Sequence, residues 1–449
     1  MENLTAAYIA RLCDGTLVGE DADVSAIVRD NREIRGGELF CAICGENFDG
    51  HSFVSDAVKK GAAAVLVSKE TEGLKAPQIV VDDTVSALGK IAKGYLEALS
   101  LHRVCITGSV GKTTTKEMCA AVLSKAFVTH KTQGNYNNNI GLPLTVFGLD
   151  KTHEAAVFEI GTNHFGEILP LAKIASPHIA VITTIGSSHL EAFGTKEGVL
   201  SEKTEILKGL TENGVAVLNG DDPLLWGIRN TLACKVRWFG TENIECDVFG
   251  EILKNGAYES RFGVRGSDTE FMLTCGGEHN VRNALAAIAV GRELGMDDAS
   301  IAEGLSEFIN TGMRQDIYDY NGITVIRDCY NANPDSVRAA IGVLRDADCS
   351  GKRICVLGDM RELGENSEKL HREVGTIASA FADVVLVTGE FSHAYKAGAT
   401  GGNVFVFEDK KALAEKLSEI TGPGDAVLVK GSYGTKMWQV LEYLQGERE

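Results

Sequence analysis

Residues 105–118 read CITGSVGKTTTKEM, a glycine-rich turn between an apolar run and a helical one. The apolar run RVCIT (103–107) is typical of a buried strand, and residues 112–127 predict a helix that begins near Lys112. A strand that leads through glycines into a helix points backbone N–H groups and the helix dipole at an anion. We therefore predict a loop that binds a nucleotide phosphate, formed by Gly108, Ser109, Val110, Gly111, Lys112, Thr113 and Thr114.

The spacing of this loop differs from that of the common P-loop, G-x-x-x-x-G-K-[ST]. That pattern needs a glycine six residues before the lysine, and Ile106 stands there. Residues 108–113 instead read G-x-x-G-K-T, in which Lys112 supplies a positive charge and Thr113 a hydroxyl ligand for Mg²⁺. The alternative is an ordinary strand-to-helix turn with an incidental lysine. Two glycines, a lysine and a threonine in this context disfavour that alternative.

Outward from the loop, apolar runs alternate with helical segments. The further strand candidates are AAVFEIG (155–161), IAVITTIG (179–186) and GVAVLN (214–219). Continuous apolar strands that alternate with helices predict a parallel, doubly wound sheet. We expect residues of about 235–277 to form an antiparallel insertion in this unit.

The whole chain therefore predicts an α/β protein of three domains. Residues 1–97 form a small N-terminal α/β module, with short β-like runs between glycine-rich turns. Residues 98–313 form the central P-loop-type parallel sheet with its insertion. Residues 314–449 contain a third alternating series, from GITVIRD to DAVLVKG, which predicts a Rossmann-like domain.

Composition excludes several classes of function. A formal charge of −18 over 449 residues argues against a nucleic-acid partner, which needs clustered Lys and Arg. No apolar run approaches the roughly 20 residues of a membrane span, and the start does not resemble a signal peptide. The eleven cysteines form no C-x-x-C pair, so we expect reduced thiols and a cytoplasmic protein. No pattern indicates an obligate interface, so a monomer is expected.

Two strand ends carry candidate metal ligands. Glu159 ends the apolar run 155–159, and His189 follows the run 179–186. In an open α/β sheet, ligands bind outside the carboxyl ends of the strands. A carboxylate and an imidazole there suit a divalent cation that bridges ATP oxygens. Either residue alone is more often structural, but beside a phosphate loop the functional interpretation is favoured.

Asparagines mark two further candidate sites. The run GNYNNN (134–139) contains Asn135, Asn137 and Asn138, whose amides suit a sugar, a pyrophosphate or a peptide, although a polar loop explains any one of them. Asn280 and Asn283 are three residues apart on one helix face. They either bind an adenine edge or cap the helix.

Arg314 and Asp328 lie near the start of the third domain. They can reach a ribose or a γ-phosphate only if that domain folds over the central one. The alternative for both is a surface ion pair.

Taken together, these motifs resemble the Mur ligase family, the ATP-dependent amide-forming ligases of peptidoglycan synthesis. The family's phosphate loop is the short T-G-[ST]-x-G-K-T form, and TGSVGKT (107–113) matches it. Four motifs resemble the branch that joins D-alanyl-D-alanine to UDP-N-acetylmuramoyl-tripeptide. They are NFDGHSF (47–53), GNYNNNIGLPLT (134–145), RDCYNANPDSV (327–337) and LGDMRELGENSEKLH (357–371).

The resemblance implies an acyl-phosphate mechanism and a role for each candidate residue. Thr113 and Glu159 would hold the magnesium of ATP, and His189 with a carbamylated Lys203 would hold a second one. Asn280, Asn283, Arg314 and Asp328 would bind adenine, ribose and phosphate. Asn331 and Asn333 would face the incoming dipeptide, and Asp30 and Arg32 would contact the uridine nucleotide. Without the resemblance, Lys203 beside Glu202 and Glu205 is best explained as a solvated lysine.

The sequence departs from the family pattern at two positions. Asn31 replaces the serine of an expected D-S-R, and Tyr433 stands where K-G-S-R predicts an arginine. No D-N-P-R element of the ligase that adds diaminopimelate or lysine is present, and the third-domain motifs are not expected in a folylpolyglutamate synthetase. The alternatives are such a ligase for a single amino acid, or a nucleotide-dependent switch that ligates nothing. The identity of the third stem residue, lysine or diaminopimelate, is left open.

Overall fold

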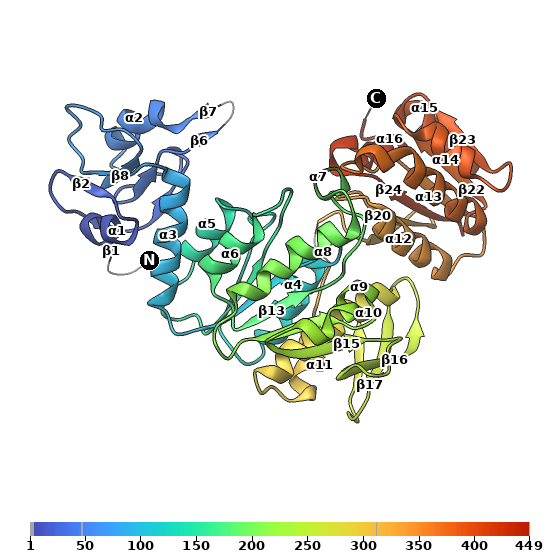
Figure 1. Ribbon diagram of the computed structural model, residues 1–449. Coiled ribbons are helices and arrows are strands. Elements are labelled where there is room, and N and C mark those ends of the chain that lie inside the picture. The colour runs from blue at the N-terminus through green and yellow to red at the C-terminus, as the bar shows by residue number, and fades with distance from the viewer. Residues whose placement is uncertain (1–3, 46–47, 311, 449) are drawn as a thin grey trace.

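The computed structural model describes residues 4–45, 48–310 and 312–448. Three main sheets follow one another along the chain (Figure 1). The central unit lies in the middle, with the N-terminal unit (blue) and the C-terminal unit (orange to red) on either side of it. Among the described helices, none is long and apolar enough to cross a membrane.

The N-terminal unit has a five-stranded sheet with α1 (Ala6–Leu12) and α2 (Val54–Lys59). Its strand order is β2 (Thr16–Val18), β9 (Gln78–Val80), β8 (Ala64–Val67), β5 (Leu39–Cys41) and β4 (Ile27–Val28). Two small pairs flank it, β1 (Leu4–Thr5) with β3 (Asp23–Val24) and β6 (Cys44–Gly45) with β7 (Phe48–Asp49). Asn47 of the motif at 47–53 lies outside the described residues.

Helix α3 (Thr84–Glu97) joins the N-terminal unit to the central one. Asp83 caps it by accepting bonds from the backbone of Val85 and Ser86. Its buried face packs on α5 (Gly141–Phe147) and α6 (Ile168–Ala175), and one hydrophobic cluster extends from Leu4 to Leu225. The two units therefore share a core on this side.

The central sheet has nine strands. Their order is β11 (Thr129–Lys131), β12 (Ala155–Glu159), β10 (His102–Thr107), β13 (Ile179–Ile182), β14 (Val215–Asn219), β15 (Lys235–Gly240), β16 (Val248–Asn255), β17 (Ser260–Val264) and β18 (Glu270–Leu273). Helices α4 (Lys112–Leu123), α10 (Glu278–Glu293) and α11 (Asp298–Ser306) cover the face opposite to α5 and α6.

The prediction of an antiparallel insertion over about 235–277 was only partly right. Strand β15 pairs parallel with β14, and β16 pairs parallel with β15, so both extend the main sheet. Only the pairs β16–β17 and β17–β18 are antiparallel. A parallel neighbour needs a crossover, and the short helix α9 (Pro223–Gly227) supplies it without a helical period long enough to recognise.

The C-terminal sheet has six strands, covered by helices on both faces. The strand order is β19 (Asp316–Tyr320), β20 (Ile323–Asp328), β24 (Ala426–Lys430), β21 (Arg353–Leu357), β22 (Val384–Thr388) and β23 (Val404–Phe407). The helices are α12 (Pro334–Asp346), α13 (Ser367–Phe381), α14 (Ser392–Gly398), α15 (Lys410–Ile420) and α16 (Trp438–Leu444). The antiparallel edge strand β19 was not predicted, and the five predicted strands are parallel.

Candidate active site

The phosphate loop connects β10 to α4, and two of its glycines have positive φ angles. Gly108 has φ 153° and Gly111 has φ 85°. A Cβ on Gly108 would lie 1.9 Å from Thr183 Oγ1, and one on Gly111 would lie 2.6 Å from Asn283 Oδ1. Both positions therefore require glycine. Gly111 caps α4 without a side chain, which leaves the first N–H groups of the helix available to an anion.

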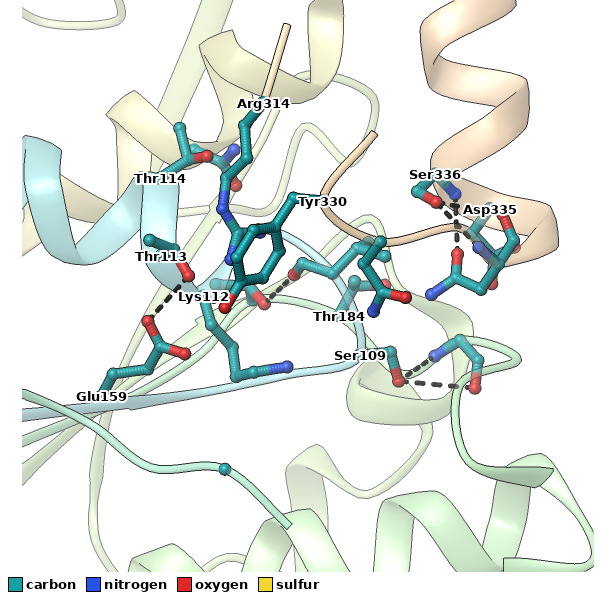
Figure 2. Close-up of a pocket in the computed structure, with 18 of the residues that line it drawn as sticks. Ser109, Lys112, Thr113, Thr114, Glu159, Thr184, Arg314, Tyr330, Asp335 and Ser336 are labelled. Atoms are coloured by element: carbon teal, nitrogen blue, oxygen red, sulfur yellow. Dashed lines mark hydrogen bonds between the residues drawn. The ribbon is translucent and has the colours of Figure 1, made fainter. Parts of the chain in front are cut away.

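Lys112 and Ser109 are held by neighbouring backbone groups, and Figure 2 shows the bonds of Ser109. Lys112 Nζ donates to the Gly108 carbonyl at 2.7 Å. Ser109 Oγ accepts from the N–H of Gly186 at 2.8 Å, which joins the phosphate loop to the loop after β13. Burial lowers the pKa of Lys112, Glu159 opposes this effect, and the positive charge of Arg314 adds to it. Two cations thus lie near each other where an anionic ligand would neutralise them.

Glu159 lies at the carboxyl end of β12 and is almost fully buried. One carboxylate oxygen accepts from Thr113 Oγ1 and the other from Asn137 Nδ2, each at 2.8 Å. Magnesium prefers oxygen ligands of this kind. The structure therefore brings the two predicted ligands of the first magnesium together and adds Asn137, whose amide orients the carboxylate.

His189 has the left-handed conformation (φ 54°, ψ 31°) at the start of α7 (Leu190–Phe193). Non-glycine residues with positive φ are uncommon and often functional. Its Nδ1 lies 2.7 Å from Glu362 Oε2, so the central and C-terminal units meet at this imidazole. Glu362 was missed in the sequence, although its motif follows a predicted strand and the carboxyl ends of such strands carry ligands.

Lys203, on α8 (Lys196–Thr204), is only 1% exposed, so the interpretation as a solvated lysine is wrong. Burial lowers its pKa well below the usual value, and Lys112 lowers it further. Within the described parts of the chain, no hydrogen bond or ion pair satisfies its amine. Its neighbour Glu202 is engaged elsewhere, accepting from the N–H groups of Gly166, Glu167 and Ile168.

A cavity of about 730 Å³ lies between the central and C-terminal units. The predicted site residues line it, except Gly108, Lys203, Asp30 and Arg32. Arg314 and Asp328 therefore meet the phosphate loop in one space, as their predicted roles require. Asp328 pairs at 2.7 Å with Lys430, which is 1% exposed, so this is not a surface ion pair. Arg314 lies over the ring of Tyr330, at 3.8 Å from its centroid (Figure 2).

Seven predicted asparagines line this cavity, and their side chains have different surroundings. Asn283 borders Gly111. Asn280 Nδ2 donates to the Gly276 carbonyl and to Gln315 Oε1. The N-cap of α10 is Gly277, which has no side chain to cap the helix. The capping alternative for the pair at 280 and 283 is therefore wrong. Asn333 caps α12 through Oδ1, and its buried Nδ2 has no partner in the described chain. Asn138 Oδ1 accepts hydrogen bonds from the backbone N–H groups of Ile140 and Gly141.

Asp30 and Arg32 lie in the N-terminal unit, outside the cavity. They form a two-pronged ion pair with a shortest distance of 2.6 Å, and the side chain of Arg32 is 83% exposed. Asn31 Nδ2 donates to Asp56 Oδ2 at 2.6 Å. Arg32 is therefore accessible to a ligand, while Asn31 is used within the fold.

A separate group, Cys44, Asp49 and His51, has ligand atoms close enough for a metal. The backbone N–H of Ser68 donates to His51 Nε2 at 2.9 Å, so the proton of the neutral ring is on Nδ1, facing Asp49 at 2.8 Å. A protonated nitrogen cannot ligate a metal. This group is therefore a hydrogen-bonded turn. All eleven cysteines are free, as predicted.

Comparisons with known proteins agree with this geometry. Three stretches match family profiles, described as "Mur ligase family, catalytic domain" (23–96), "Mur ligase middle domain" (106–291) and "Mur ligase, glutamate ligase domain" (313–433). The chain is 38% identical to the UDP-N-acetylmuramoyl-tripeptide–D-alanyl-D-alanine ligase of Bacillus subtilis, over 98% of both chains. It is similar to the crystal structure of MurF from Acinetobacter baumannii (TM-score 0.93, 32% identity, 99% of both chains). It is also similar to MurF ligase from Thermotoga maritima in complex with ADP (TM-score 0.84, 31% identity, 94% of this chain and 97% of that one).

Proposed function

Because this chain belongs to the Mur ligase family, we propose that it is an ATP-dependent ligase of peptidoglycan precursor synthesis. It joins D-alanyl-D-alanine to the terminal carboxylate of UDP-N-acetylmuramoyl-tripeptide and releases ADP and phosphate. One observation carries the proposal. A single cavity combines a phosphate loop, the candidate metal ligands Thr113, Glu159 and His189, and a donor-rich surface of the C-terminal unit.

The first step activates the carboxylate. Its oxygen attacks the γ-phosphorus of ATP, the bond to the β-phosphate oxygen breaks, and an acyl phosphate and ADP result. Both reactants are anionic, so the chain must neutralise charge and position them. Lys112 and the N-terminus of α4 face the phosphates, and Arg314 adds a second cation from the other side of the cavity.

Asn280, Asn283, Arg314 and Asp328 bind the nucleotide in this proposal. Asn283 borders the phosphate loop, while Asn280 and Asp328 line the part of the cavity formed by α10 and β20. Asp328 is oriented by Lys430, which also donates to the Asn331 carbonyl at 2.8 Å. A carboxylate fixed in this way can accept hydrogen bonds from ribose hydroxyls.

Magnesium fits two groups of residues. Thr113 and Glu159 would hold one ion, and His189 with a carbamylated Lys203 the other. The ions would neutralise phosphate oxygens and the substrate carboxylate. A bare ammonium offers no lone pair, whereas CO₂ addition to the neutral amine yields an oxygen ligand. The burial of Lys203, its lowered pKa and its lack of a described partner support the carbamate.

In the second step, the amine of the dipeptide attacks the acyl carbon and phosphate leaves from a tetrahedral intermediate. Asn331 and Asn333 face this acceptor in the proposal. The unpartnered Nδ2 of Asn333 supports it, because a buried donor without a partner is costly until a ligand oxygen satisfies it. Asn135 and Asn137 border the same cavity from the central unit and would contact the nucleotide-linked peptide.

The N-terminal unit, residues 1–97, would hold the uridine nucleotide through Asp30 and Arg32. Residues 98–313 would bind ATP, and residues 314–449 would complete the ATP site and bind the dipeptide. ATP and UDP-linked sugars are cytoplasmic metabolites, which supports a cytoplasmic enzyme. We also propose a monomer, because no pattern in the sequence indicates an obligate interface.

The test measures phosphate release and product mass with purified nucleotide-tripeptide, ATP and D-alanyl-D-alanine. The expected product carries the mass of both substrates less one water, and phosphate is released only when the dipeptide is present. A ligase for a single amino acid would ignore the dipeptide. A nucleotide-dependent switch would release phosphate slowly whether or not an acceptor is added.

A further inference from the structure

Arg361 lies on the loop after β21, next to Glu362, the residue that pairs with His189. The backbone of this loop is fixed by two hydrogen bonds. The N–H of Arg361 donates to Ser432 Oγ, and the N–H of Met360 donates to His371 Nε2, each at 2.9 Å. Met360 is buried, whereas Arg361 is exposed. The chain therefore holds the base of the Arg361 side chain in place and leaves the rest of it exposed to solvent.

The guanidinium of Arg361 has no carboxylate within 4.0 Å among the residues that the structure describes. Glu362, its neighbour, pairs with His189 instead. The group lies against Gly434, where a Cβ would come within 2.5 Å of Nη1. In a chain with a net charge of −18, an arginine in a fixed position without an acidic partner is available to an anionic ligand.

Three loops of the C-terminal unit meet at the backbone of Arg361. Ser432 Oγ accepts from the N–H of Arg361 and donates to the Ala332 carbonyl at 3.3 Å. These loops follow β21, β24 and β20, which are neighbours in the sheet. The carboxyl ends of adjacent parallel strands are where such sheets bind ligands. Ala332 stands between Asn331 and Asn333, which line the cavity, so Ser432 links the backbone of Arg361 to the surface proposed for the dipeptide. Arg361 does not itself line the cavity, but its neighbour Glu362 does.

We propose that Arg361 binds the C-terminal carboxylate of the incoming dipeptide and thereby selects an acceptor with a free carboxylate. This inference rests on the proposed function. The amine of the dipeptide must reach the acyl phosphate in the cavity, and two extended residues span only about 7 Å. The carboxylate is then left near the rim of the cavity. A guanidinium binds a carboxylate through two parallel hydrogen bonds, which fixes orientation as well as charge.

Tyr433 is the residue before Gly434, against which the guanidinium lies. It is exposed, and its ring packs against Tyr330 at 5.9 Å and Trp438 at 5.0 Å between centroids. Aromatic side chains of this kind offer apolar surface to the methyl groups of a bound peptide. Position 433 is where the family pattern predicts an arginine. In this chain the cation comes from Arg361, which lies against the next residue, Gly434.

The test compares two acceptors, D-alanyl-D-alanine and the same dipeptide with a C-terminal amide, in the full-length enzyme. Arg361→Ala should raise KM for the free dipeptide by roughly ten- to a hundredfold, as expected for loss of a charge-assisted pair. The kcat and the KM values for ATP and nucleotide-tripeptide should change less than about twofold. For the amidated dipeptide, KM should be nearly the same in the wild type and the variant, because the charge that Arg361 recognises is missing.

Arg361→Lys keeps a charge and should recover part of the preference for the free carboxylate. Arg372→Ala removes an exposed arginine from α13 and should change neither acceptor's KM. The proposal is overturned if Arg361→Ala leaves the ratio of the two KM values unchanged, or if it raises KM for the nucleotide-tripeptide instead. If the wild type ligates neither acceptor, the proposed function itself fails, and that outcome is distinct from either of these.

Discussion

At the scale of single residues, the proposed function gives Lys112 the most direct role in charge neutralisation. It begins α4, and its amine points back to the carbonyl of Gly108. Replacing it with alanine should lower kcat at least about a hundredfold, because one lost donor to a transition-state anion typically costs that much. ADP formation measures the loss, and the thermal unfolding midpoint should stay near that of the wild type.

Lys125→Ala is the matched control for this variant. Lys125 lies just beyond the same helix and pairs on the surface with Glu303 and Glu307. An exposed pair of this kind contributes little to stability, so activity should be retained. Near-normal turnover of Lys112→Ala would show that the loop is not the ATP site.

Lys203 differs from Lys112 because its amine has no partner among the described residues, whereas Lys112 donates to the Gly108 carbonyl. Lys203→Ala should lose most activity, and acetate should restore part of it by filling the vacated ligand position. Lys203→Arg should stay inactive, because an oxygen ligand and not a positive charge is needed. An independent readout is carbon-13 NMR of enzyme equilibrated with labelled bicarbonate, where a carbamate signal should be present in the wild type and absent from both variants.

The carbamate assignment would be wrong if Lys203→Arg ligated well, or if the labelled wild type gave no carbamate signal. His189 would then need another partner for its magnesium. The buried amine would in that case have to be explained by the fold alone.

At the scale of elements, the start of α13 is held to the loop after β21 by one imidazole. His371 Nε2 accepts from the N–H of Met360, and Nδ1 donates to the Ser367 carbonyl at 2.6 Å. This arrangement needs the neutral ring. Burial lowers the pKa of His371, so below the usual value of 6.5 the unfolded chain binds a proton that the folded chain excludes. Stability from this group is complete above pH 6.5 and is lost as the pH falls toward the lowered pKa.

The unfolding midpoint should therefore fall less steeply between pH 7 and pH 5 in His371→Gln than in the wild type. The corresponding slopes of the free energy of unfolding against pH should differ by at most about 1.4 kcal/mol per pH unit, the limit for one proton. His164→Gln serves as the control, since the side chain of His164 is 76% exposed. Equal slopes for the wild type and His371→Gln would contradict the assignment.

At the scale of the whole molecule, we expect ligation to depend on how the C-terminal unit is placed against the central one. Asp335 Oδ2 accepts from the N–H of Ser187 at 2.7 Å, and the Glu362 carbonyl accepts from the N–H of Glu191 at 3.3 Å. These contacts hold the loop with His189 between the two units. Small-angle scattering should show a smaller radius of gyration when an ATP analogue and nucleotide-tripeptide are added.

Gly186→Ala tests this contact directly. A Cβ there would lie 2.4 Å from Asp335 Oδ2, so the Asp335 carboxylate must move away and its hydrogen bond from the N–H of Ser187 is disturbed. Ligation should fall roughly a hundredfold, because misplacement by about 1 Å has that effect. The radius of gyration should no longer respond to ligands. Gly342→Ala, where no atom lies within 4 Å of the added Cβ, should behave as the wild type. Full activity of Gly186→Ala would show that this contact is not needed.

Much of the molecule follows from local sequence. The phosphate loop, the buried strands and the helices beside them were predicted because periodicity and glycine placement are properties of short segments. The carboxyl ends of those strands directed attention to Glu159 and His189, and the structure has Glu159 bonded to Thr113. The family motifs, which extend over all three units, carried the prediction of the reaction.

Other features were decided only by tertiary structure. The burial of Lys203, the position of Arg314 in the cavity of the phosphate loop and the parallel pairing of β15 each depend on segments that are distant in sequence. Glu362 contacts His189 from a different unit, 173 residues along the chain from it, and Arg361 lies beside Gly434. The sequence of a short segment determines its hydrophobic periodicity and the chemistry of its side chains. Which side chains become buried or meet across a cavity is set by the packing of whole sheets, and no local pattern encodes that.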